Sequence, residues 1–275
     1  MRATSLRQSL LQYILLLPGI TVIIFPMYIT ITLALKTPAE SARSFFALPS
    51  SLYLGNFAKV LEGEFWVYAT NSLIITGVSV FLVVMIVPAV SFAVSRNFNK
   101  RYFKYLYYLM LTGIFIPFQV IMLPVLKHLS SMHLQNKVGI IIMYIVLSFS
   151  QGLFLCVGFL KNVPMELDEA SRIDGCGILR TFIRVIYPLM TPIIVTLVTL
   201  QSLWIWNDFA LPLVLLNSSP NYWTLPMFIY NFSNEYSFDY NLAFAAFLLS
   251  MLPILAVYGF LQKRIIAGLT EGAIK

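Results

Sequence analysis

The chain contains six uncharged, predominantly apolar runs, and each is long enough to cross a lipid bilayer as a helix. A hydrocarbon core of about 30 Å needs roughly 20 helical residues at a rise of about 1.5 Å each. The runs occupy residues 10–35, 67–95, 105–126, 138–160, 185–207 and 240–262. All are too long for the strands of a core sheet. The sequence therefore predicts an all-α, polytopic membrane helix bundle with six transmembrane helices, in a single domain over residues 1–275.

The composition excludes a soluble protein. Charged residues make up 11% of the chain, against roughly 25% in ordinary soluble domains. Hydrophobic residues reach 59% and the mean hydropathy is +0.84, so the chain lacks the polar residues that a hydrated surface needs. The first run is longer than the core of a secretory signal, and no small-residue cleavage pattern follows it. We expect it to be an uncleaved span.

The distribution of basic residues predicts the orientation of the bundle. Thirteen of the 18 Lys and Arg residues lie in the N-terminal tail, the second and fourth connections and the C-terminal tail. The other five lie in the first and third connections, and the fifth has none. Because cytoplasmic segments carry the excess of positive charge, both termini are predicted to be cytoplasmic, as six spans require. The expected location is the inner (cytoplasmic) membrane, crossed several times.

Several other functional classes fit the sequence poorly. The net charge of +7 is spread over short gaps between apolar runs rather than gathered on one face, so we do not expect nucleic-acid binding. Cys156 and Cys176 form no CxxC pair or disulfide framework, and we interpret them as packing residues. His128 and His133 have no nearby cysteines or carboxylate cluster, so no metal site is predicted.

The connection between the fourth and fifth runs predicts a short helix at about residues 164–175. Pro164 suits a first helical turn because its missing N–H would have no partner there. Glu166, Asp168 and Glu169 place negative charge where the helix dipole favours it, and Gly175 suits the left-handed residue that ends a helix. About eleven residues span only about 16 Å, so this helix does not cross the membrane.

The predicted short helix is amphipathic. Leu167, Ala170 and Ile173 recur three apart and share one side. A surface helix at lipid headgroups is the simpler alternative, but four acidic residues against one arginine would be repelled by anionic lipids. These residues are Glu166, Asp168, Glu169, Asp174 and Arg172. Docking into the groove of a protein is the better fit.

The same segment resembles the "EAA" signature of permeases in binding-protein-dependent ABC importers. The resemblance is carried by Glu169-Ala170-Ser171, Gly175 and Val185-Ile186-Tyr187-Pro188, with departures at Ser171, Val185 and Tyr187. Further similarity to the carbohydrate-import branch, and to its maltose-type six-span subunits, comes from four other features. They are Phe182, Pro192, the Trp206–Pro212 string and the Gly268–Lys275 tail.

The resemblance implies that the short helix sits in a cleft of a cytoplasmic ATPase and converts its closure into helix movement. The implied coupling residues are Glu166, Leu167, Glu169, Ala170, Ser171, Asp174 and Gly175. No G-x-x-x-x-G-K-[ST] phosphate loop occurs in the chain, so this subunit is expected to be no enzyme and to bind no cofactor itself. ATP and Mg²⁺ would belong to two copies of the partner ATPase. A second permease subunit and an extracytoplasmic sugar-binding protein are the other implied partners.

Residues near the end of the fifth run are candidates for the substrate pathway. Asp208 is the acidic residue closest to membrane depth, where charges usually line a cavity or pair with another group. Trp204 could stack on a sugar ring, while Gln201 and Asn207 could bind hydroxyl groups. The alternative is that the tryptophans of this region form an interfacial aromatic belt.

The resemblance also implies that the fifth outer connection reaches the binding protein. This segment, residues 217–239, is rich in polar and aromatic residues and has no Lys or Arg. Asn221, Tyr222 and Asn231 are its candidate contact residues.

The favoured function is therefore half of the translocation pathway of an ATP-driven importer for a sugar, and the expected substrate is an oligosaccharide. The first alternative is an ABC permease for another solute such as glycerol phosphate, which a cationic pocket would favour. An ion-coupled secondary transporter would ordinarily carry ionisable residues in several spans and show two related halves. A membrane enzyme is disfavoured because no H-E-x-x-H or G-x-S-x-G motif occurs.

Overall fold

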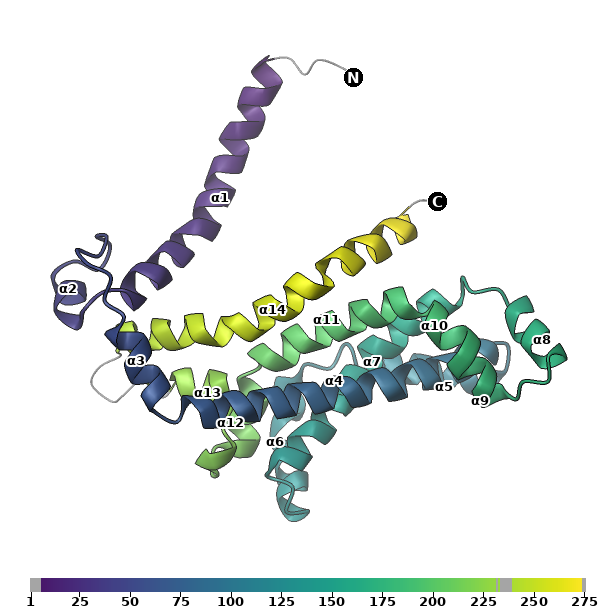
Figure 1. Ribbon diagram of the computed structural model, residues 1–275. Helices are drawn as coiled ribbons and strands as arrows, with labels where there is room; N and C mark the ends of the chain where they lie inside the picture. The colour runs from purple at the N-terminus through teal and green to yellow at the C-terminus, as the bar shows by residue number, and fades with distance from the viewer. Residues whose placement is uncertain (1–5, 231, 233–238, 274–275) are drawn as a thin grey trace. The chain divides into compact units, whose positions relative to one another are not determined.

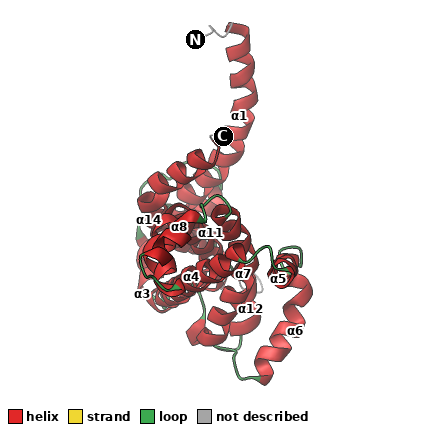
Figure 2. Ribbon diagram, turned by 90° about the vertical axis from the view of Figure 1, so that its right-hand side faces the viewer, coloured by secondary structure: helices red, strands yellow, loops and turns green. Residues whose placement is uncertain are grey.

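A computed structural model describes residues 6–230, 232 and 239–273, with side-chain surroundings over most of residues 16–260. Within these residues the chain forms helices and loops and no β-strand (Figure 2). Two compact units are formed: Met1–Trp66 with Phe228–Leu252, and Val67–Met227 with Pro253–Lys275. The all-α prediction is confirmed over the described part of the chain.

The helices vary widely in length (Figure 1). The first unit contains α1 Leu6–Ala34, α2 Pro38–Arg43, α3 Gly55–Glu62 and the first half of α14 Tyr240–Ala273. The second contains most of α4 Phe65–Arg96, then α5 Arg101–Thr112, α6 Phe118–Ser131, α7 Lys137–Leu160, α8 Glu166–Ile173, α9 Ile178–Thr181, a π-helical turn Phe182–Ile186, α10 Tyr187–Leu189, α11 Thr191–Asn207, α12 Ala210–Leu216 and a 3₁₀ turn Pro220–Tyr222. The helix α13 Leu225–Tyr230 passes from the second unit to the first.

Four single helices of the described chain are long and apolar enough to cross a membrane. They are Leu16–Ala34, Phe65–Arg96, Lys137–Leu160 and Tyr240–Phe260. Each coincides with a predicted run: the first, second, fourth and sixth. Pro88 and Pro253 lie inside two of them without ending the helix, as buried membrane helices allow.

The predicted continuous span at residues 105–126 is wrong in one respect, because this run forms two helices. The helix α5 ends at Thr112 and α6 begins at Phe118. Pro117 is the extended N-cap of α6 and donates no hydrogen bond, and a proline disfavours helical geometry in the residue before it. In the break, the N–H groups of Ile114 and Phe115 bond three residues back instead of four.

The fifth predicted run, 185–207, also departs from a straight helix. Its two arms, Ile178–Leu189 and Thr191–Asn207, meet at an angle of 75°. Pro188 and Pro192 flank the bend at Met190, and Pro192 has no N–H to bond the Pro188 carbonyl. The Thr191 hydroxyl donates to that carbonyl instead, at 2.6 Å. Residues 185–189 therefore belong to a different arm from 191–207.

The core of the second unit is built where α4, α7 and α11 meet. Val87, Ile140 and Leu197 are fully buried there. Gly152 of α7 permits the close approach: a Cβ atom at this position would lie 2.9 Å from Val87 Cγ1 and 3.3 Å from Leu197 Cδ1. Small residues at helix contacts are the usual means of tight packing in membranes.

Candidate functional site

The helix α8 is the structural form of the predicted short helix, but it is shorter than the predicted 164–175. It has eight residues, Glu166–Ile173, and Met165 is its N-cap. Pro164 therefore precedes the cap instead of opening the first turn. The carbonyl of Val163, and more weakly that of Pro164, accepts a hydrogen bond from the Arg96 guanidinium, at 3.0 and 3.5 Å. Because these carbonyls bind a side chain instead of helical N–H groups, the helix begins after them.

The end of α8 follows the prediction for Gly175. This residue has φ +80°, in the left-handed region that glycine adopts without strain. The Gly175 N–H bonds the Arg172 carbonyl at 3.0 Å, and the Cys176 N–H bonds the Ser171 carbonyl at 2.9 Å. This pair of bonds is the Schellman arrangement, which satisfies the last carbonyls and turns the chain sharply.

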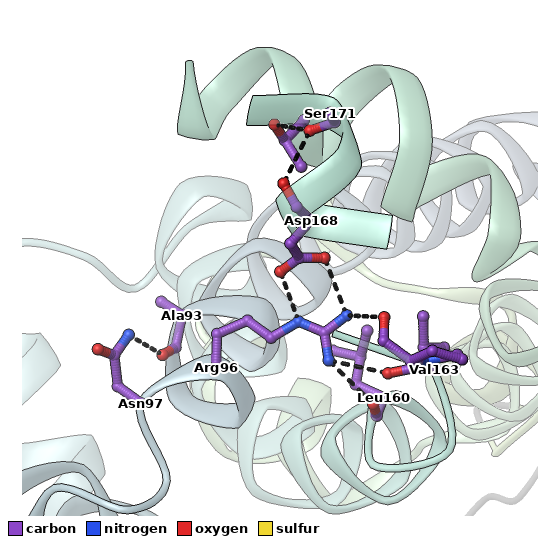
Figure 3. Close-up of polar contacts among 9 residues, drawn as sticks. Ala93, Arg96, Asn97, Leu160, Val163, Asp168 and Ser171 are labelled. Carbon is purple, nitrogen blue, oxygen red and sulfur yellow. Dashed lines mark hydrogen bonds and ion pairs between the residues drawn. The ribbon is translucent and has the colours of Figure 1, made fainter. Parts of the chain in front are cut away.

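A bidentate ion pair joins α8 to the end of α4 (Figure 3). Arg96 Nε donates to Asp168 Oδ2 at 2.8 Å, and Arg96 Nη2 donates to Asp168 Oδ1 at 3.1 Å. The two side chains are only 10% and 11% exposed. Burial and the two parallel bonds distinguish this contact from an ordinary surface ion pair.

The same guanidinium also binds the segment that ends α7. Arg96 Nη1 donates to the carbonyls of Val163 at 3.0 Å and Leu160 at 3.5 Å (Figure 3). One side chain thus connects the last residue of α4, the exit of α7 and the first turn of α8. Sequence reasoning missed this role, because Arg96 counted only as a cytoplasmic charge. The one available signal was that Asp168 and Ser171, three apart, lie on one side of the helix, turned away from Ile173.

Ser171 lies on the inner side of α8. It is buried, and its hydroxyl lies 2.5 Å from that of Thr181 at the end of α9. The turn at Gly175 returns the chain so that α9 packs on this side. The small side chain of Ser171 therefore allows α9 to pack closely against α8.

The opposite side of α8 is exposed. Six of the seven predicted coupling residues are exposed: Glu166, Leu167, Glu169, Ala170, Asp174 and Gly175. Ile173 is 87% exposed, and after the turn Ile178 and Leu179 are also largely exposed. We call Leu167, Ala170 and Ile173 the apolar face of α8. An apolar stripe flanked by carboxylates suits a protein groove with basic edges. The sequence analysis did not predict that Ile178 and Leu179 add to the exposed apolar surface near α8.

The candidate pathway residues separate into two groups. Gln201 is 1% exposed, and its side chain accepts from Ser148 Oγ at 2.7 Å and donates to Gln151 Oε1 at 3.3 Å. Asp208 accepts from the Tyr144 hydroxyl at 3.0 Å. Gln201 and Asp208 therefore belong to a polar contact between α7 and the end of α11.

Trp204 and Asn207 form the second group. Both are exposed, and Trp204 contacts the Tyr144 ring edge-on at a centroid distance of 5.6 Å. The Asn207 side chain bonds the Leu203 carbonyl of its own helix at 2.8 Å. With Leu200 they follow helical spacing along one exposed stripe of α11.

The segment that follows α12 is fixed to α4 by its backbone. Asn71 Nδ2 donates to the carbonyls of Asn221 and Trp223, both at 2.9 Å. The Leu225 N–H donates to the Ser72 hydroxyl at 2.9 Å. Tyr222 is partly exposed, with Lys137 Nζ 5.5 Å from its ring centroid. Asn231, the third candidate of this segment, lies outside the described residues.

Comparison with known proteins identifies relatives along nearly the whole chain. Residues 85–271 match the family described as "Binding-protein-dependent transport system inner membrane component". The multiple sugar-binding transport system permease protein MsmG of Streptococcus mutans is 40% identical over 266 residues, which cover 96% of each chain. The probable starch degradation products transport system permease protein AmyC of Thermoanaerobacterium thermosulfurigenes is 32% identical, over 96% of this chain and 97% of the relative.

Two further similarities concern a third relative and the fold. The melibiose/raffinose/stachyose import permease protein MelC of Bacillus subtilis is 30% identical over 91% of each chain. A crystal structure of a bacterial ABC transporter involved in the import of the acidic polysaccharide alginate superposes with a TM-score of 0.82. That superposition covers 96% of this chain and 99% of the other at 20% identity, so it shows a shared fold.

Proposed function

Since this chain belongs to the family of binding-protein-dependent transport system inner membrane components, and is a permease subunit of a carbohydrate ABC importer, we propose that α8 receives force from a partner ATPase. The observation that carries this proposal is the position of α8. Its apolar face is exposed, while Asp168 on its other side is clamped to the ends of α4 and α7 by Arg96.

Each side of α8 has a separate task in this mechanism. Leu167, Ala170 and Ile173 dock in a groove of the ATPase, and the exposed carboxylates of Glu166, Glu169 and Asp174 pair with basic residues at its edge. Arg96 and Asp168 then carry the displacement of α8 to two long helices. Closure of the ATPase biases a bundle with two packed states, so the helices rock as rigid bodies.

The proposed topology has six spans with both termini in the cytoplasm. The pair α5 and α6 forms the third span and the bent pair around Met190 forms the fifth. The helices α5 and α6 have lengths of roughly 18 and 21 Å, so each alone is too short to cross. The uneven distribution of the 18 basic residues supports this orientation.

The chain acts in an assembly. We propose a second permease for the other half of the pathway, two copies of an ATPase that bind ATP and Mg²⁺, and an extracytoplasmic binding protein. In this assembly the chain itself hydrolyses no ATP and binds no metal or nucleic acid. The segment around Asn221 and Tyr222 is the proposed docking site of the binding protein.

The substrate is proposed to be an oligosaccharide. The relatives are named for multiple sugars, for starch degradation products and for melibiose, raffinose and stachyose. The exposed stripe of α11 offers Trp204 for stacking and Asn207 for hydroxyl groups. The contact of Tyr144 with Asp208, and that of Ser148 with Gln201, hold α11 against α7 and so fix the direction of this stripe.

Reconstitution tests the proposed function. The tagged chain should be recovered from native membranes together with a second permease and an ATPase. In proteoliposomes the assembly should take up a labelled oligosaccharide only with ATP and the binding protein present. Recovery without any ATPase, from membranes shown to preserve complexes, would contradict the assembly. Uptake driven by an ion gradient without ATP would contradict the mechanism.

A further inference from the structure

The connection after α1 folds back along that helix. The Tyr28 hydroxyl donates to the Phe46 carbonyl at 2.6 Å, and the Phe25 and Phe46 rings stack at a centroid distance of 6.1 Å. Tyr28 and Phe25 precede the last residue of α1, Ala34, by roughly 9 and 14 Å along the helix axis. The chain then returns, because the Tyr53 N–H bonds the Leu35 carbonyl at 3.0 Å. Residues 44–48, which we call the fold-back tip, thus lie beside α1 instead of beyond its end (Figure 1).

The surface of the fold-back tip is apolar. Phe46 is 59% exposed and Leu48 is 71% exposed. No charged residue occurs between Arg43 and Lys59. The neighbouring α1 residues Ile23 and Met27 are also exposed, and they belong to a candidate membrane span. This combined surface would be costly in water, at about 25 cal/mol for each Å² of apolar area.

Three carbonyl groups of the tip, those of Ser44, Phe45 and Phe46, accept hydrogen bonds from side chains of the first unit. Lys36, only 1% exposed, donates from Nζ to the carbonyls of Ser44 at 3.0 Å and Phe45 at 3.4 Å. Tyr28 satisfies the next carbonyl, that of Phe46. The Ala47 N–H donates to the Ser44 hydroxyl at 3.2 Å. Irregular backbone needs such internal partners at membrane depth, where no water replaces them.

The position of Lys36 is explained by the same requirement. A lysine with no room for water is expensive, and in membranes such a residue pairs with backbone carbonyls. Lys36 also lies just beyond the C-terminus of α1, where the helix dipole favours positive charge. Its charge is therefore directed at two carbonyls of the fold-back tip.

We infer that the fold-back tip is embedded in lipid, in the leaflet where α1 ends, with Phe46 and Leu48 among the acyl chains. In the orientation proposed above, this is the outer leaflet. The occupant is lipid because the tip is recessed behind the end of α1 and continues the exposed face of a membrane span. Since the tip carries no charge, its depth should not depend on whether the headgroups are anionic or zwitterionic.

Spin-label accessibility tests this inference in the assembled complex in lipid nanodiscs. The label is placed at Leu48→Cys after Cys156 and Cys176 have been replaced by serine. Val22→Cys on the exposed face of α1 is the lipid reference, and Lys59→Cys on α3 is the aqueous reference. The ratio of oxygen to water-soluble nickel accessibility at residue 48 should approach that at the deeper residue 22 and exceed that at residue 59 several-fold.

Two results would overturn the inference. Accessibility at residue 48 equal to that at residue 59 would place the tip in water. Shielding from both reagents would mean that a protein covers it, and adding the binding protein would identify which one.

Replacement of Lys36 tests the role of its ammonium group. Lys36→Met should shift the label at residue 48 toward nickel accessibility, because the Ser44 and Phe45 carbonyls would then need water. Lys59→Met removes an exposed lysine of the nearby helix α3 and should cause no shift. If Lys36→Met does not insert, Tyr28→Phe removes only the bond to Phe46 and should cause a smaller shift. No shift in any inserted variant would refute the role of internal hydrogen bonding.

Discussion

Arg96 and Asp168 are 72 residues apart in the sequence, yet their side chains form two parallel hydrogen bonds of 2.8 and 3.1 Å. The pair joins the final residue of a membrane-length helix to the first turn of an eight-residue helix. Since both side chains are largely buried, removing either one leaves the charge of the other buried without its partner. In the proposed mechanism, this contact is the point where a force on α8 enters α4.

Removing one partner of this pair should uncouple transport. Arg96→Ala leaves the Asp168 carboxylate buried without its partner, a change that costs about 3–5 kcal/mol in comparable sites. We expect ATP hydrolysis to continue while sugar transported per ATP falls, measured in proteoliposomes. Arg172→Ala, at an exposed arginine of α8, is the control and should change the ratio of transported sugar to hydrolysed ATP little. A normal ratio in correctly assembled Arg96→Ala would contradict the proposal.

Gly175→Leu should uncouple transport for a reason of backbone conformation. A Cβ at Gly175 meets nothing within 4 Å, but φ is +80°, which costs other residues about 1–2 kcal/mol. Gly177→Leu is the matched control, because that position is equally open and has φ −72°. Uptake and ATPase rates of both variants check this prediction. Equal behaviour of the two variants would show that the left-handed turn is unimportant.

Reversing the charge at Glu169 should weaken docking of the ATPase. Its exposed carboxylate lies beside the apolar face of α8, where a basic groove edge would attract it. Glu169→Lys should lower both the amount of ATPase that co-purifies and the uptake rate. Glu62→Lys, at an exposed position of α3, should leave both unchanged. Normal uptake by assembled Glu169→Lys would argue against this contact.

Gly152→Leu should disrupt the packing of the second unit. Because a single Cβ would already lie 2.9 Å from Val87, a leucine forces α7 away from α4 and α11. Overpacking of this kind costs about 1–3 kcal/mol. Gly158→Leu is the control on the same helix, since its Cβ would meet nothing within 4 Å. Thermal unfolding in detergent should show a lower midpoint for Gly152→Leu alone.

The loop after α1 should loosen in acid. Hydrogen bonds from the Ser50 hydroxyl and the Thr37 N–H lower the pKa of Glu40 from 4.5 to about 2. A lowered pKa in the folded state means that the stabilisation is complete above pH 4.5 and is lost as the pH falls toward 2. Label mobility at residue 48 should therefore rise over that interval. Glu40→Gln should remove this pH dependence, and its persistence would assign the effect to another group.

Sequence periodicity predicted the long helices well but could not tell which prolines break them. Pro88 and Pro253 lie within continuous helices, whereas the run is interrupted before Pro117 and bends between Pro188 and Pro192. The difference depends on whether neighbours satisfy the freed backbone groups, and that is a property of the tertiary structure.

The site was predictable where its chemistry is local. The left-handed Gly175 follows from helix-end rules, and the acidic first turn of α8 follows from the helix dipole. Arg96 and the buried Ser171 were not predictable, because their partners are distant in the sequence or return through a turn. The hydrogen bonds of Gln201 to Ser148 and Gln151 could not be predicted for the same reason.

Asn71 and Arg96 lie on one helix, α4, separated by roughly 38 Å at the helical rise per residue. One fixes the turn at Asn221 and the other fixes α8. In the proposed mechanism, an event that favours one position of α4 at either end therefore changes the binding free energy at the opposite end. Thermodynamic reciprocity makes the two effects equal. If the proposed binding protein docks at the Asn221 turn, its solute-loaded form tightens docking of the ATP-bound ATPase at α8. That docking in turn tightens the attachment of the binding protein by the same factor.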